Sequence, residues 1–164
     1  RTSSTPLFDK VLNGLKKEVR DNILINDHIP DEELPFFYKA ASLFVYPSIG
    51  EGFGIPPLEA AAMETPVVCS NMLGLKQFDF FEQDHVDPRN EEAFCERVLK
   101  ILSGDISMKQ LESRSQYVQK VFSWKTAADS FQKLIINDHN LRTNDSIPGH
   151  RKQEGSVPAE VSHR

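Results

Sequence analysis

Cysteine is scarce in this chain, with two residues in 164. Cys69 and Cys95 lie far apart, and neither has the spacing of a C-x-x-C pair or of a metal site. The histidines likewise show no ligand spacing. We therefore predict no metal site, and we expect both cysteines to be reduced thiols in the core.

Long hydrophobic runs and an excess of positive charge are also missing. No apolar run approaches the roughly 20 residues that span a bilayer, so a transmembrane segment is not expected. Lys and Arg number 19 against 24 Asp and Glu, a net charge of −5, which disfavours nucleic acid as a partner. Apolar residues at 39% and charged residues at 26% are typical of a soluble globular chain. The expected location is the cytoplasm, with attachment to a membrane surface left open.

Short apolar runs alternate with helical patterns along most of the chain. This alternation predicts an α/β fold, a Rossmann-like parallel sheet with helices on both faces. Residues 1–136 are predicted to form one such lobe, and residues 137–164, with few and non-periodic apolar residues, a disordered tail. Strands are expected at 23–25, 43–46, 67–69 and 85–86, and helices at 6–19, 31–41, 56–63, 91–102, 106–121 and 123–134.

Helix caps and aromatic residues give more specific expectations. Asp31 is predicted to cap the second helix and Ser123 the last one. Trp124 and Phe131 stand at helical spacing, and we expect them to pack in the core.

The most informative segment is a glycine-rich loop between a predicted strand and a predicted helix. It reads Ser-Ile-Gly-Glu-Gly-Phe-Gly-Ile-Pro-Pro-Leu-Glu over residues 48–59. In open α/β sheets, ligands bind at the carboxyl ends of strands, where a helix N-terminus offers free amides to a diphosphate. Glu51 and Glu59 would add two acceptors for the hydroxyls of a sugar or ribose. The residue types alone leave open a tight turn carrying two solvated glutamates.

This segment is neither G-x-G-x-x-G nor G-x-x-x-x-G-K-[ST], so dinucleotide and nucleoside-triphosphate sites lose their main support. It resembles instead the retaining glycosyltransferases of family 4, which have two Rossmann-like lobes in the arrangement called GT-B. Glu51 and Glu59 match the E-x7-E motif of that family. The resemblance covers residues 7–136 and continues through Asp31-Glu32-Glu33-Leu34, Tyr38-Lys39-Ala40-Ala41, Pro47-Ser48, Thr65-Pro66-Val67-Val68, Asp87-Pro88 and Phe122-Ser123-Trp124.

The resemblance implies a role for each part of the loop. Glu59 would bind the ribose hydroxyls of a nucleotide diphosphate sugar, and Glu51 would face the transferred hexose and stabilise an oxocarbenium-like transition state. The amides around Gly52, Phe53, Gly54 and Ile55 would hold phosphate oxygens and sugar hydroxyls. The family retains the configuration of the sugar, is usually assigned a front-face mechanism and needs no metal or other cofactor. GDP-mannose is one expected donor.

The sequence also departs from the family. Asp27 and Glu64 stand where glycine is usual, and Gln77 stands near a usual glutamate. The acceptor-binding lobe and the basic residues that contact the donor diphosphate would precede Arg1. We therefore expect an N-terminally truncated donor-binding lobe, inactive by itself, whose carbohydrate or lipid-linked acceptor binds the missing lobe. The alternative is a non-catalytic nucleotide-sugar-binding module or a degenerate interaction module.

Overall fold

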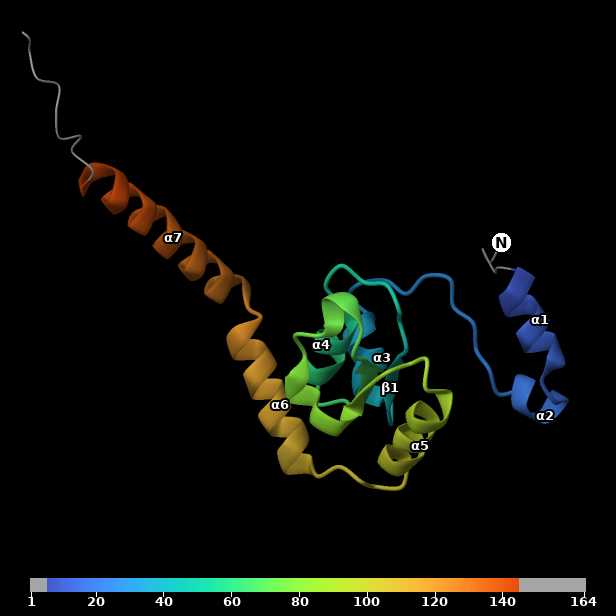
Figure 1. Ribbon diagram of the computed structural model, residues 1–164. Coiled ribbons are helices and arrows are strands. Elements are labelled where there is room, and N and C mark those ends of the chain that lie inside the picture. Colours follow the sequence, from blue (N-terminus) through green and yellow to red (C-terminus); the bar gives the residue numbers. More distant parts are fainter. Residues whose placement is uncertain (1–5, 145–164) are drawn as a thin grey trace, which may run out of the picture. The chain divides into compact units, whose positions relative to one another are not determined.

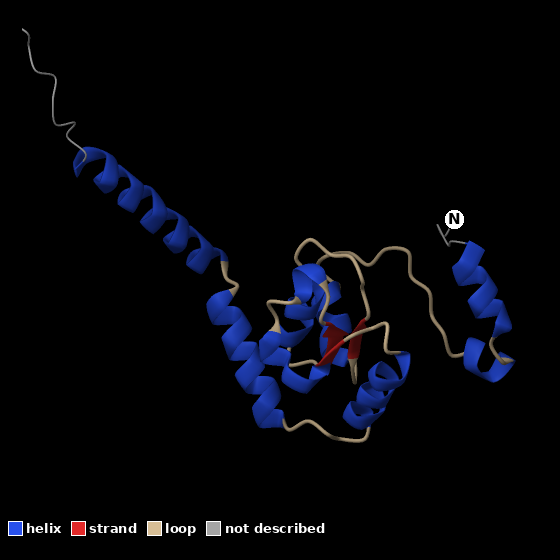
Figure 2. Ribbon diagram, viewed as in Figure 1, coloured by secondary structure: helices blue, strands red, loops and turns tan. Residues whose placement is uncertain are grey.

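A three-stranded parallel sheet forms the centre of the fold. The computed structural model describes residues 6–144. The strands are β1 (Phe44–Tyr46), β2 (Val67–Ser70) and β3 (His85–Val86), and they lie side by side in that order (Figure 2). Phe44 pairs with Val67, and Cys69 pairs with His85. All carboxyl ends of the strands therefore meet at one edge of the sheet.

Helices alternate with these strands along the chain, as predicted (Figure 1). Two short 3-10 helices, η1 and η2, lie between β2 and β3. The bounds are α1 Pro6–Gly14, α2 Lys17–Arg20, α3 Leu34–Ala40, α4 Ile55–Ala62, η1 Leu73–Leu75, η2 Asp79–Asp84, α5 Glu91–Leu102, α6 Met108–Val121 and α7 Trp124–Asn144. The predicted first helix, 6–19, is two helices, α1 and α2.

Both faces of the sheet are covered. All four residues of β2 are buried. Val68 packs in one cluster with Phe94 and Ile101 of α5. Its neighbours along the strand point to the opposite face, and α4 contacts β1 and β2. Outside α4 lies α6, whose Ser115 hydroxyl donates to the Ala62 carbonyl at 2.8 Å. The predicted α/β fold with a Rossmann-like parallel sheet and helices on both faces is confirmed.

The expected strand at 23–25 is wrong. Residues 23–25 form a loop in which Leu24 is 90% exposed. The amide of Ile23 donates to the carbonyl of Arg20, in the turn that ends α2. A β-branched run becomes a strand only where a neighbouring strand pairs with it, and among the described residues none pairs with this segment.

Asp31 does not cap the following helix. Its N-cap is Glu33, which makes no side-chain capping bond. The amides of Glu33 and Leu34 donate instead to the carbonyl of Pro30, so a turn precedes α3 and moves its start beyond Asp31. Ser123 does cap α7, because its hydroxyl oxygen accepts from the amide of Thr126 at 3.1 Å.

Several burial expectations also need correction. Cys69 is buried, but Cys95 is exposed on α5 because it lies off the buried stripe of that helix. Trp124 is 92% and Phe131 65% exposed. Both lie in a separate unit that begins at Phe122, whose described part is the single helix α7, and one helix cannot bury its own apolar face.

Helix α7 continues to Asn144, so the predicted lobe boundary at residue 136 falls inside it. The rest of the predicted tail lies outside the described residues. Across the described part of the chain, no helix combines the length and apolar character needed to cross a membrane.

Candidate functional site

The glycine loop joins the carboxyl end of β1 to the N-terminus of α4. Gly54 is the N-cap of α4 and has φ of +86°, in the left-handed region that favours glycine. A Cβ atom at this position would lie 2.1 Å from Cδ2 of Leu75. Pro56 and Pro57 follow in the first turn, where missing amides cost nothing. Gly54 is therefore required both by its backbone angle and by the lack of space.

A second loop, which follows β2, lies against the glycine loop. The amide of Gly74 donates to the Glu51 carbonyl at 3.3 Å. A Cβ atom at Gly74 would lie 2.4 Å from the Gly52 carbonyl oxygen, so this close approach needs glycine. The exposed Gln77 donates from Nε2 to the Gly74 carbonyl at 3.0 Å. The two loops thus form one surface at the carboxyl ends of β1 and β2.

Glu51 is held by two neutral donors. The hydroxyl of Tyr46 donates to its Oε1 at 2.6 Å, and the hydroxyl of Ser48 donates to the same oxygen at 2.9 Å. Both bonds lower the pKa of Glu51 below its ordinary value, and the bond from Tyr46 has the larger effect. Glu51 is therefore an anion at neutral pH and below, with Oε2 available to a ligand.

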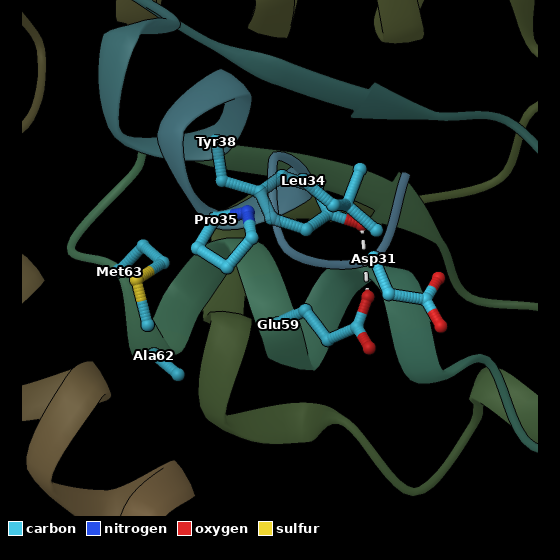
Figure 3. A pocket seen from close by; sticks show the side chains of 7 residues that line it. All are labelled: Asp31, Leu34, Pro35, Tyr38, Glu59, Ala62 and Met63. Carbon is cyan, nitrogen blue, oxygen red and sulfur yellow. Dashed lines mark hydrogen bonds between the residues drawn. The ribbon is translucent and has the colours of Figure 1, made fainter. Parts of the chain in front are cut away.

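Glu59 is held in a similar way from α3. The hydroxyl of Tyr38 donates to its Oε2 at 3.0 Å. Tyr38 is itself buried, and its carbonyl accepts from the Thr65 hydroxyl at 2.7 Å. Figure 3 shows this phenol and the Glu59 carboxylate facing each other at the border of a pocket.

The pocket beside Glu59 has a volume of about 410 Å³. Two carboxylates, those of Asp31 and Glu59, lie at its rim, and the rest of its lining is largely apolar (Figure 3). Its lining residues are Asp31, Leu34, Pro35, Tyr38, Glu59, Ala62 and Met63. An apolar cavity with a few polar groups is typical of a small-molecule site.

The structure places the predicted site residues along one loop and one helix. Gly52, Phe53 and Ile55 are exposed, whereas Gly54 is buried beneath them. The ring of Phe53 packs edge-on against Phe78, with ring centroids 5.7 Å apart. Glu51 lies in the loop, and Glu59 lies in the second turn of α4, on the pocket side.

Sequence reasoning did not identify Tyr38 and Tyr46 as site residues. Tyr46 could have been found, because it is the last residue of β1 and stands five positions before Glu51. Tyr38 could not, because 21 positions separate it from Glu59 and only the packing of α3 on α4 brings them together.

The fold and this site define a class: an α/β lobe with a glycine loop and two hydrogen-bonded glutamates at the carboxyl ends of parallel strands. Residues 11–124 match the family of glycosyl transferases group 1. The chain belongs to that family.

Several named proteins are similar in sequence to part of this chain. It is 40% identical over 98 residues to the O-antigen chain mannosyltransferase B of Escherichia coli, which covers 60% of this chain and 26% of that protein. It is also 40% identical over 133 residues to the mannosylfructose-phosphate synthase of Agrobacterium fabrum, covering 76% of this chain and 29% of that protein. The chain thus spans less than a third of the length of either relative. No solved structure matches it.

Proposed function

We propose that this chain is the donor-binding lobe of a retaining glycosyltransferase of family 4, which moves mannose from GDP-mannose to a glycan acceptor. The observation that carries the proposal is the geometry of the E-x7-E pair. Glu51 and Glu59 flank a glycine loop at the carboxyl ends of parallel strands, and Glu59 borders a pocket of about 410 Å³.

In this proposal Glu59 binds the nucleoside. Tyr38 uses one lone pair of Oε2, which leaves Oε1 and the second lone pair of Oε2 to accept the two ribose hydroxyls. The pocket that Glu59 borders is large enough for a nucleoside, and its apolar lining suits the faces of a base.

Glu51 would face the transferred sugar. Tyr46 and Ser48 both donate to Oε1, so Oε2 is left to accept a sugar hydroxyl or to stabilise positive charge that develops at the reacting carbon. Its lowered pKa suits this electrostatic role, because the carboxylate must be charged to stabilise an oxocarbenium-like transition state. The exposed loop at Gly52, Phe53 and Ile55 would offer its amides to phosphate oxygens and sugar hydroxyls, with Gly54 setting its backbone path.

The names of the relatives support mannose as the sugar. Two carry the name mannosyltransferase in O-antigen chain synthesis, one of them the protein from Escherichia coli and the other, from Salmonella typhimurium, 46% identical over 55 residues. By the same argument we propose a carbohydrate or lipid-linked acceptor that binds outside this lobe.

One observation favours a second candidate, a nucleotide-sugar-binding module without catalysis. Gln77, where the family usually has a nearby glutamate, donates to the carbonyl of Gly74 and brings no charge to the second loop. Such a module would bind the donor without transferring its sugar.

Calorimetry on the purified chain tests the proposal. We expect saturable binding of GDP and GDP-mannose in preference to UDP and UDP-glucose. Glu59→Gln should weaken the binding of both preferred ligands about 10-fold or more, because it removes the charged acceptor of the ribose hydroxyls. Glu112→Gln, at an exposed position on α6, is the matched control and should change nothing. A folded chain that binds none of these ligands would contradict the proposal.

A further inference from the structure

The two tyrosines that hold the glutamates belong to one row of aromatic rings. Tyr38 packs edge-on against Phe44, with ring centroids 5.3 Å apart and an interplanar angle of 83°. Phe44 stacks on Tyr46 at 5.9 Å and 19°. The hydroxyls at the two ends of this row donate to Glu59 and to Glu51. A continuous packed path therefore connects the two carboxylates.

The fold fixes this aromatic row. Phe44 and Tyr46 are two positions apart on β1, so they share one face of the sheet. Tyr38 comes from α3, and the bond from Thr65 to its carbonyl fixes its backbone. Rings packed in this way leave each phenol oxygen little freedom to move.

We propose that Tyr38 and Tyr46 are positioning residues, which hold Glu59 and Glu51 in the orientation that a nucleotide sugar requires before the donor arrives, with Phe44 as the spacer between them. The inference rests on the proposed function and adds the residues that prepare its two carboxylates.

The chemistry of the two tyrosine hydroxyls favours a positioning role. Burial and the bond to Glu51 raise the pKa of Tyr46 to about 12, and burial with the bond to Glu59 raises the pKa of Tyr38 as well. Both hydroxyls therefore keep their protons at neutral pH. A neutral hydroxyl orients a carboxylate but leaves its negative charge in place, whereas Lys or Arg would neutralise it.

The two tyrosines should affect different parts of the donor. Tyr38 acts through Glu59, so Tyr38→Phe should weaken the binding of GDP and of GDP-mannose equally, by about 3- to 10-fold. Tyr46 acts through Glu51, so Tyr46→Phe should weaken the binding of GDP-mannose by a similar factor and leave the binding of GDP unchanged. Both variants keep the ring, and therefore the row of aromatic contacts.

The pH dependence gives a readout that a structural role alone would not change. The bond from Tyr46 is the largest cause of the lowered pKa of Glu51. In Tyr46→Phe the pKa of Glu51 should rise, so the loss of GDP-mannose affinity on acidification should begin at higher pH than in the wild type.

Calorimetric titration of GDP and GDP-mannose into the wild type, both variants and the control Tyr117→Phe, an exposed position on α6, tests the inference. Selective weakening as described, with unchanged binding in Tyr117→Phe, would support it. If the wild type binds both ligands and the two variants bind like it, or if Tyr46→Phe weakens the binding of GDP as much as that of GDP-mannose, the positioning roles are wrong while the proposed function stands. If the wild type binds neither ligand, both are overturned.

Discussion

The carboxylates at the site and the carboxylate in the core have partners of opposite kinds. Asp84 is 1% exposed and receives hydrogen bonds from two arginines, Arg97 and Arg114. Glu51 and Glu59 receive theirs from neutral hydroxyls and keep part of their surface in solvent. Charge is neutralised where it is buried, and it is retained at the candidate site.

The core cluster of Asp84, Arg97 and Arg114 joins segments that are distant in sequence. Arg114 on α6 donates to Asp84 at 2.6 Å and to the Phe81 carbonyl at 2.8 Å, and its guanidinium lies 5.6 Å from the centre of the Phe81 ring. Arg97 on α5 also bonds to Asp105. This cluster joins η2, α5 and α6, so its role is to hold the fold together.

Breaking the core cluster should have the largest effect. Asp84→Ala leaves two buried guanidinium groups without their shared partner, which should lower the free energy of unfolding by about 3–5 kcal/mol. Urea unfolding followed by circular dichroism measures this loss. The control Glu96→Gln removes an exposed pair with Lys100, which water screens, and should lower stability far less. Equal losses in the two variants would mean that the buried cluster does not stabilise the fold.

Distorting the loop that presents Glu51 should have the next largest effect. Gly54→Ala forces a side chain into the left-handed region and toward Leu75, at a cost of at least about 1–2 kcal/mol. Gly50→Ala, where a Cβ atom meets nothing within 4 Å, is the matched control, and we expect a much smaller change. Thermal unfolding of both variants checks the difference. A Gly54 variant as stable as the Gly50 variant would contradict the loop geometry.

Relieving strain behind Glu59 should stabilise the lobe. Glu64 has φ of 62°, and the amide of Thr65 bonds to the carbonyl of Ala60, as in a helix end that normally carries glycine. Glu64→Gly should therefore raise the free energy of unfolding by about 1 kcal/mol without changing nucleotide binding. Urea unfolding measures the gain, and a loss of stability would show that the Glu64 side chain is needed there.

Removing charge at the site should have the smallest effect on stability. Because the pKa of Glu51 is lowered in the folded state, its contribution is present above the ordinary pKa of glutamate. That contribution is lost as the pH falls through the lowered value. Glu51→Gln should therefore lower stability slightly at pH 7, where the contribution is present, and flatten the decline in acid. Unfolding midpoints between pH 3 and pH 7 test this, and a steeper acid decline in the variant would contradict it.

The local sequence pattern predicted the strands that pair in the sheet, but it did not distinguish them from an apolar run that has no partner strand. The runs at Phe44–Tyr46 and at 23–25 look alike in sequence, yet one pairs with β2 and the other lies in an exposed loop. Pairing depends on partners that an apolar run does not reveal. The left-handed angle at Glu64 was predictable, because it stands where the family usually has glycine.

The site was predictable only in part for the same reason. The glycine loop and its glutamates lie within twelve positions, so their sequence pattern was visible. The partners of Glu59 and of the buried Asp84 come from elsewhere in the chain: Tyr38 lies 21 positions from Glu59, and Arg114 lies 30 positions from Asp84. Such pairs follow from packing, which no local pattern encodes.

The ratio of GDP-mannose to GDP affinity, measured by calorimetry in the wild type, Glu51→Gln and Glu59→Gln, tests the central claim most directly. We expect the ratio to fall toward one in Glu51→Gln, which would lose the proposed contact to the sugar. In Glu59→Gln both affinities should fall and the ratio should stay close to that of the wild type. Unchanged affinities in both variants would show that the donor does not bind between these two glutamates.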